Sequence, residues 1–264
     1  EYHKAGGGSQ IDCQPGGAGR DGKMLAFLSR ATQVNIVACT GYHLEKYYPP
    51  NYWLFSASVE KAIDFFCSEI EQGLEECLQA GLSVKADFIK IACRTTLNSS
   101  PVKVMEAAAE TSLQTGATIE IHTEKGGSAE DFVNFFVNHN LPANRLILCH
   151  IDKRPDMGLH TELAKSGVVL EYDSFFRPKY YPEEIVWPLI SKLCADGLSS
   201  SIAFATDLAE SALWKNLGGG PGLIGFISSI RQRLFDLELD DITVNNLTGG
   251  NICRRLTIAN PILN

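Results

Sequence analysis

Short apolar runs that alternate with helical patterns constrain the fold of this chain more than any other feature of its sequence. Strands that alternate with helices predict a parallel sheet with right-handed crossovers. Nearly continuous apolar strands predict a sheet covered on both faces. The predicted strands are GSQIDC (8–13), VNIVACT (34–40), ADFIKIA (86–92), TIEIHT (118–123), RLILCHID (145–152), VVLEYD (168–173) and SIAFATD (201–207). The predicted helices are 21–32, 58–80, 101–115, 128–139, 157–166 and 182–196.

Two architectures fit this alternation, an open doubly wound sheet and a closed (β/α)8 TIM barrel. No G-x-G-x-x-G sequence follows a strand, so the open sheet lacks its nucleotide-binding fingerprint. Lys90, His122, His150, Asp173 and Asp207 all lie at or near the C-terminal ends of different strands. Those ends converge on one pocket in a barrel. We therefore predict an α/β TIM barrel that forms a single domain over residues 1–264, although only seven strands are visible.

The composition excludes several classes of partner. A net charge of −8 over 264 residues argues against nucleic-acid binding, and no apolar stretch is long enough to span a bilayer. The opening residues EYHKAGGGSQ show no apolar signal region. The eight cysteines include no C-x-x-C pair, which favours buried thiols in a reducing compartment. We expect a cytoplasmic protein with a small-molecule partner and no membrane partner.

Lys90 is the unusual residue of the strand ADFIKIA. Strand residues alternate between faces, so Phe88, Lys90 and Ala92 share one side. An ammonium buried there is costly unless it is paired or modified. A neutral lysine amine can add carbon dioxide and become a carbamate, which is an anionic oxygen ligand. The alternative is a lysine whose stem is buried and whose amine reaches solvent near the strand end.

Two histidines and an aspartate occupy equivalent places on other strands. His122 follows the run TIEI of one predicted strand, His150 follows the apolar run of the next, and Asp207 ends the last. A single histidine there is more often structural, and a lone aspartate after a strand is commonly a helix cap. Two imidazoles, a carboxylate and Lys90 together predict a site for a divalent metal ion.

Several short motifs, in their order and spacing, resemble the phosphotriesterase-like branch of the amidohydrolase superfamily. The resemblance runs from residue 1 to about residue 258. The motifs are AGGGSQIDCQPGGAGRD (5–21), VNIVACTGYH (34–43), DFIKIA (87–92), IHTEKGG (121–127), CHIDKRPD (149–156), EYDSFFRPKYYPEE (171–184), ATD (205–207) and GGGPG (218–222).

This resemblance implies a binuclear metal hydrolase on a (β/α)8 barrel. Lys90 would be the carbamate that bridges two ions, and His122 and His150 would bind the more exposed ion. Asp207 would be a ligand and the catalytic proton acceptor. The implied metal is two Zn²⁺, with Mn, Co or Fe as alternatives. The implied reaction is hydrolysis of a lactone or other ester, with phosphotriesters as promiscuous substrates, and the family is often homodimeric.

The sequence departs from the family at its start. The family carries a His-x-His pair on its first strand, and no such pair occurs here; His3 is the only early histidine. We expect the chain to begin after the first βα unit and to hold at most one ion with these residues alone. The alternatives are a truncated, catalytically inactive barrel that acts as a binding protein, and a barrel enzyme that uses a single ion.

The residues Tyr42 and His43 are predicted to contact the substrate. They follow the strand 34–40, where lactonase-like relatives place an aromatic residue of the pocket. The alternative for these residues is packing on the rim of the barrel.

A second group of predicted substrate contacts comprises Arg177, Lys179 and Tyr180 in the loop FFRPKYYPEE. The basic side chains could bind a phosphate or carboxylate. Similar loops occur in relatives that open phosphorylated sugar lactones, and those relatives also carry Arg and Tyr after the last-strand Asp. Glu210 and Leu213 stand in those places here. The alternative is a solvated loop.

Overall fold

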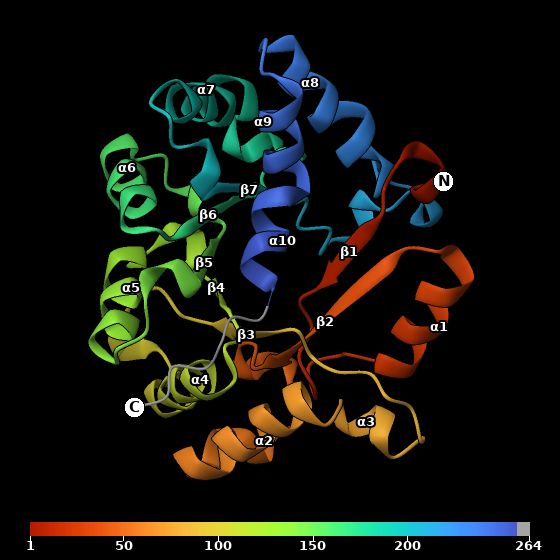
Figure 1. The fold of residues 1–264 in the computed structure, drawn as a ribbon, viewed down its shortest axis with the longest axis vertical. Coiled ribbons are helices and arrows are strands. Elements are labelled where there is room, and N and C mark those ends of the chain that lie inside the picture. Colours follow the sequence, from red (N-terminus) through yellow and green to blue (C-terminus); the bar gives the residue numbers. More distant parts are fainter. Residues whose placement is uncertain (258–264) are drawn as a thin grey trace. The chain divides into compact units, whose positions relative to one another are not determined.

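The computed structural model describes residues 1–257, which form two compact units. The N-terminal unit comprises Gly8–Ile147 and the described residues from Arg255 on. The C-terminal unit comprises Leu148–Arg254 and Glu1–Gly7. Each unit contains strands that alternate with helices, as predicted from the sequence (Figure 1). That residues 1–264 form a single domain stays a prediction.

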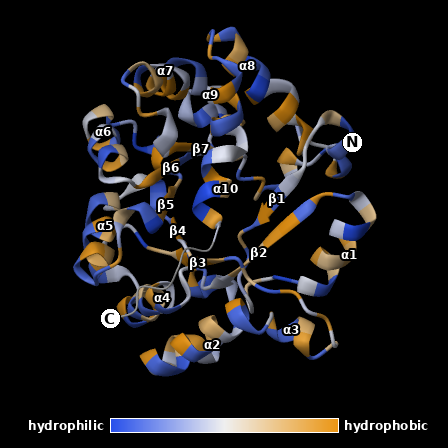
Figure 2. Cartoon of the chain, in the orientation of Figure 1, coloured by the Kyte–Doolittle hydropathy of each residue, from blue (hydrophilic) through white to orange (hydrophobic). Residues whose placement is uncertain are grey.

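Parallel strands form the centre of the N-terminal unit. Their order is β1 (Ser9–Asp12), β2 (Asn35–Gly41), β3 (Phe88–Ala92) and β4 (Ile119–His122), which is also their order along the chain. Every residue of β3 is buried, and Figure 2 shows β1 and β2 largely in the colours of hydrophobic residues. The four predicted strands are therefore confirmed, to within one or two residues at their ends.

Helices of the N-terminal unit pack on these strands and on one another. Contacts join α1 to β2, α4 to β3, and α2 to both β2 and α4. The Asp21 and Ser58 side chains begin α1 and α2 by accepting hydrogen bonds from the backbone N–H of Met24 and Lys61. The bounds are α1 (Gly22–Thr32), α2 (Val59–Glu71), α3 (Glu75–Leu78), α4 (Val102–Thr115) and α5 (Ala129–Asn138).

The helix predicted over residues 58–80 is in fact two helices. Gly73 lies between α2 and α3 with a φ of 149°, a conformation that glycine adopts without the steric cost of a Cβ atom. The backbone N–H of Leu74 then donates to the carbonyl of Val84 instead of continuing the helix. The chain therefore turns at Gly73, and the prediction of one continuous helix was wrong.

The C-terminal unit repeats the alternation. Strand β5 (Leu146–Cys149) spans the point in the sequence where the two units divide, and β6 (Val169–Tyr172) pairs in parallel with β7 (Ile202–Phe204). The helices α6 (Met157–Ser166) and α7 (Trp187–Ala195) accompany these strands (Figure 1). The later helices were not predicted from the sequence; they are α8 (Gln232–Asp236), α9 (Asp241–Asn245) and α10 (Asn251–Leu256).

No helix within residues 1–257 combines the length and the apolar character that crossing a bilayer requires.

A buried cationic side chain ties together the loops of the N-terminal unit. Arg20, between β1 and α1, donates to both carboxylate oxygens of Glu69 on α2 and of Glu76 on α3. Its guanidinium also donates to the carbonyl of Cys39 on β2 at 2.7 Å. Burial would raise the pKa of Glu76, but the hydrogen bonds and charge of Arg20 outweigh it and lower that pKa. One guanidinium thus compensates two carboxylates.

We expect Arg20→Ala to lower the free energy of unfolding by about 3–5 kcal/mol, because it leaves the buried carboxylate of Glu69 without its cation. Urea unfolding followed by circular dichroism measures this. Arg30→Ala is the matched control, since Arg30 lies on the same loop-helix segment but is exposed. Equal losses in the two variants would contradict a structural role for the Arg20 cluster.

His160 holds together two elements of the C-terminal unit. This residue of α6 is fully buried, its Nε2 lies 2.9 Å from the carbonyl of Arg154, and its Nδ1 lies 2.6 Å from the hydroxyl of Tyr172 on β6. A carbonyl only accepts, so Nε2 donates and Nδ1 accepts from Tyr172. Burial lowers the pKa of His160 and outweighs the opposite effect of the hydrogen bond to the Arg154 carbonyl. The folded protein therefore holds His160 as a neutral imidazole.

The lowered pKa of His160 predicts a loss of stability on acidification. Below the unfolded pKa of about 6.5, the unfolded chain binds a proton that the folded chain does not, so the free energy of unfolding falls as the pH falls from 6.5 toward the folded pKa. Urea unfolding at pH 7.5 and 5.0 measures this slope. His160→Gln should reduce the slope, whereas His3→Gln, at an exposed position, should preserve it. An unchanged slope in His160→Gln would refute the assignment.

Candidate functional site

Three potential metal ligands meet in the C-terminal unit. His150 follows β5, Asp173 follows β6 and Asp207 follows β7, and their ligand atoms all lie within 4.8 Å of one another. His150 Nδ1 is 2.6 Å from Asp173 Oδ2 and 3.9 Å from Asp207 Oδ2. The structure therefore brings together His150 and Asp207, both predicted as ligands, and adds Asp173 between them.

The backbone at two of these residues is held in an unfavourable conformation. His150 has a φ of 64° and Asp207 a φ of 43°, in the left-handed region that residues with a Cβ atom seldom adopt. Asp173 Oδ2 accepts from the backbone N–H of His150 at 3.0 Å, and Arg177 donates to the carbonyl of Asp207 at 2.6 Å. Strain of this kind persists where surrounding contacts impose it, and it concentrates at functional sites.

A buried ammonium lies against the two carboxylates. Lys153 Nζ is 3.4 Å from Asp173 Oδ1 and 3.3 Å from Asp207 Oδ2. Burial would lower the pKa of Lys153, but the charges of Asp173 and Asp207 outweigh it and raise that pKa. Lys153 is therefore charged, and the two carboxylates together attract a cation to this position.

Asp152 organises the turn that carries Asp173. Its Oδ2 accepts from the backbone N–H groups of Asp173 and Ser174, at 3.1 and 2.9 Å, and from the Ser174 hydroxyl at 2.5 Å. Burial and the neighbouring charge of Asp173 raise the pKa of Asp152 to about 6. Burial also acts to raise the pKa of Asp173, but His150 and Lys153 outweigh it and hold that pKa well below its usual range. On acidification, Asp152 is therefore protonated before Asp173.

The donor set of this cluster fits a divalent ion. One imidazole nitrogen and two carboxylates are ligand types that zinc and other borderline divalent metals accept. The position of the Lys153 ammonium shows that the cluster already draws positive charge. Sequence reasoning noted Asp173 at a strand end but gave it no ligand role, because its distance from His150 is set by the fold.

Lys90 is buried in the N-terminal unit, and its charge is paired. The residue is 4% exposed, and its Nζ lies 2.6 Å from Glu120 Oε1. The pair forms because β3 and β4 are in register with Lys90 opposite Glu120. Cys13 also donates its thiol to Glu120 Oε1 at 3.1 Å. Sequence reasoning missed Glu120, although it lies between two isoleucines just as Lys90 does.

Two histidines lie side by side in the same unit. The rings of His43 and His122 have centroids 5.5 Å apart, and His122 Nε2 is 3.8 Å from Glu124 Oε2. His43 Nδ1 accepts from the backbone N–H of Leu44 at 2.7 Å. A predicted substrate contact, His43, thus adjoins a predicted metal ligand, His122.

Tyr42 lies in the core rather than on a surface. It is fully buried, and its ring packs edge-on against Phe55 with centroids 6.5 Å apart. Its backbone N–H donates to the carbonyl of Lys90 at 2.8 Å. Gly41 permits this close approach, because a Cβ there would lie 1.9 Å from the Lys90 carbonyl oxygen. The burial favours the packing alternative for Tyr42 over direct contact with a substrate.

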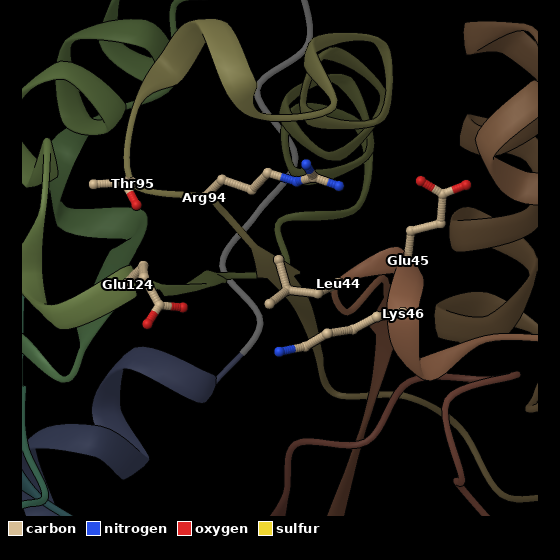
Figure 3. Close-up of a pocket in the computed structure, with 6 residues that line it drawn as sticks. All are labelled: Leu44, Glu45, Lys46, Arg94, Thr95 and Glu124. Carbon is tan, nitrogen blue, oxygen red and sulfur yellow. The ribbon is translucent and has the colours of Figure 1, made fainter.

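A pocket of about 340 Å³ opens at the strand ends of the N-terminal unit. Its lining comes from the segments that follow β2, β3 and β4. One lining residue, Glu124, is the residue whose carboxylate lies 3.8 Å from His122 Nε2. In Figure 3, Leu44 and Lys46 extend from one side and Thr95 and Glu124 lie on the other. A cavity of this volume suits a small molecule. The lining residues are Leu44, Glu45, Lys46, Arg94, Thr95 and Glu124.

The two basic residues of the predicted anion-binding loop differ in their contacts and in their exposure. Arg177 is buried, and its guanidinium contacts the carboxylate of Asp207 at 2.9 Å and that of Glu210. Lys179 is exposed, with its ammonium 5.3 Å from the centroid of the Tyr180 ring. Arg177 is therefore committed to carboxylates of the protein, whereas Lys179 remains accessible.

That Lys90, His122, His150 and Asp207 share one pocket stays a prediction. The first two residues belong to the N-terminal unit and the other two to the C-terminal unit.

We expect Asp173→Asn to weaken the binding of Zn²⁺ or Co²⁺ at least about tenfold, because it removes a negative charge from the cluster and the carboxylate that pairs with His150. Equilibrium dialysis with metal analysis measures the dissociation constant. Asp196→Asn is the control, since Asp196 is an exposed residue of the same unit that pairs with Lys192. Equal affinities in the two variants would show that Asp173 takes no part in metal binding.

The amino-acid sequence of this chain is similar to the sequences of known enzymes. The chain is 29% identical over 231 residues to a phospho-furanose lactonase of Mycoplasmopsis synoviae, covering 83% of this chain and 65% of that protein. It is 25% identical over 272 residues to an N-acetyltaurine hydrolase of Dictyostelium discoideum, covering 97% of this chain and 71% of that protein. The chain thus spans about two thirds of the length of these relatives.

Solved structures share the fold. A lactonase from Listeria monocytogenes matches with a TM-score of 0.88 at 24% identity, covering 98% of this chain and 84% of that one. The phosphotriesterase homology protein of Escherichia coli, solved with phosphate in its active site, matches with a TM-score of 0.87 at 22% identity, covering 97% and 86%. These likenesses confirm the predicted α/β fold class. The model of the phosphotriesterase family matches residues 1–246, and the chain belongs to that family.

Proposed function

We propose that this protein is a metal-dependent hydrolase that cleaves a lactone or another ester bond. The observation that carries the proposal is the cluster of His150, Asp173 and Asp207, whose ligand atoms meet at the ends of successive strands. Membership of the phosphotriesterase family and relatives named as lactonase and hydrolase support the reaction class.

In this proposal, each residue of the cluster formed by His150, Asp173 and Asp207 has a distinct task. His150 and Asp207 hold an ion, and Asp207 accepts the proton released during hydrolysis. Asp173 fixes the ring of His150 through its 2.6 Å contact. A bound divalent ion would polarise the ester carbonyl and lower the pKa of water. Zinc suits the donor set, and manganese, cobalt or iron are the alternatives.

Lys90 and His122, both in the N-terminal unit, are further proposed ligands of the metal site. Lys90 is the proposed carbamate, which forms once its amine has lost a proton and added carbon dioxide. The burial of Lys90 supports this role, because burial favours the neutral amine. Its present pairing with Glu120 opposes it, so carbamate formation requires the 2.6 Å contact to open. His43 and the adjoining pocket are proposed to receive a small-molecule substrate.

We also propose a cytoplasmic protein without nucleic-acid or membrane partners. Its net charge is −8, and its cysteines include no C-x-x-C pair. None of the eight cysteines, all within residues 1–257, forms a disulfide. A homodimer is proposed from the family resemblance alone.

The proposal predicts that Lys90→Ala loses bound metal and ester hydrolysis together, with partial rescue by a short-chain carboxylate supplied with the metal. Metal analysis and a screen of lactones and esters measure both properties. A complete binuclear site gives two ions per chain, whereas the ligands named here give at most one. Lys85→Ala, at an exposed lysine on the segment before β3, should behave as wild type.

Wild-type metal content and rate in Lys90→Ala would rule out the bridging role. A wild-type protein that binds no metal and hydrolyses no ester would instead support the alternative of an inactive barrel with a binding function.

A further inference from the structure

Ion pairs join Arg177, in the loop that follows β6, to two carboxylates in the loop that follows β7. The Nη2 of Arg177 contacts Asp207 twice, at 2.9 Å from its Oδ2 and 2.6 Å from its carbonyl oxygen. The Nη1 of the same guanidinium donates to Glu210. Arg177 is only 8% exposed, so its cationic group lies between two carboxylates of the protein. Arg177 is consequently a positioning residue, since it spans both the side chain and the strained backbone of Asp207.

Glu210 differs from the other anionic residues of this cluster because its side chain is 56% exposed. The hydrogen bond and charge of Arg177 lower the pKa of Glu210, and the charges of Lys179 and Lys153 act in the same direction. Glu210 is therefore ionised at neutral pH and lies within electrostatic reach of three cations. A substrate anion that approached this loop would compete with Glu210 for the same positive charges.

We propose that Glu210 is a specificity residue that excludes phosphorylated and other dianionic substrates and leaves neutral lactones or esters as the substrate class. The proposal rests on the proposed hydrolase function. Two negative charges brought near Glu210 meet repulsion from an ionised carboxylate and find Arg177 already occupied. A neutral lactone meets neither obstacle. Arg177 and Lys179 were predicted to bind an anion of the substrate. In this proposal, the negative charge of Glu210 offsets their positive charge.

The test measures the binding of inorganic phosphate to the metal-loaded protein by calorimetry at low ionic strength. Glu210→Gln keeps the size of the side chain and removes its charge, so we expect phosphate to bind at least about fivefold more tightly than in wild type. Glu210→Asp keeps the charge and should leave the affinity near that of wild type. Glu183→Gln is the matched control, because Glu183 is an exposed carboxylate of the same unit paired with Arg233 at 3.0 Å.

The double variant Glu210→Gln/Arg177→Gln assigns the gain. We expect the added affinity for phosphate to disappear when the guanidinium is also removed. A gain in Glu210→Gln no larger than in Glu183→Gln, or one that survives in the double variant, would overturn the proposal. Circular dichroism of each variant confirms that the comparison is made between folded proteins.

A substrate pair extends the test to turnover. The ratio of kcat/KM for a neutral lactone to kcat/KM for its phosphorylated counterpart should fall at least about fivefold in Glu210→Gln. Phosphate binding requires no turnover, so its outcome is independent of the hydrolase assignment. Tighter phosphate binding without hydrolysis of any lactone or ester would refute the proposed function and leave the role of Glu210 in anion exclusion intact. Unchanged binding with active hydrolysis would do the reverse.

Discussion

The buried ion pair between Lys90 and Glu120 constrains the strands of the N-terminal unit. Parallel register places the two residues opposite each other on β3 and β4, with 2.6 Å between Nζ and Oε1. A slip of one residue would turn one of the charges to the other face of the sheet. Each charge would then be buried without its partner, a change that typically costs several kcal/mol. A pair of hydrophobic residues at these positions would lose less stability in such a slip. The ion pair therefore helps to fix the register of β3 and β4.

The same requirement for compensated charge shapes the C-terminal unit. Asp173 and Asp207 are brought close enough to share Lys153, and His150 lies against Asp173. Two like charges at this distance are tolerated only with cations beside them. The left-handed backbone of His150 and Asp207 adds a local cost that the hydrogen bonds of Asp173 and Arg177 offset. Anionic donors held in this way provide a prearranged place for a metal ion.

Substrate selection can be understood from the charges that remain accessible around these carboxylates. Arg177 is buried and paired, whereas Lys179 and Glu210 are exposed with opposite charges. The net charge of this loop can therefore change without any change in the buried carboxylates. The relatives include a phospho-furanose lactonase and an N-acetyltaurine hydrolase, which are named for different substrates.

The sequence by itself determined the positions of all seven strands, the burial of Lys90 and the placement of His150 and Asp207 at strand ends, because apolar alternation and strand polarity are local properties of the chain. The break at Gly73 and the helices after residue 226 escaped prediction, since a single glycine or a short helix leaves a weak periodic signal. Only the tertiary structure decided which charges meet. Glu120, Lys153, Asp173 and Glu210 owe their partners to strand register and loop geometry, and these join residues about 20 to 60 positions apart through packing that no local pattern encodes.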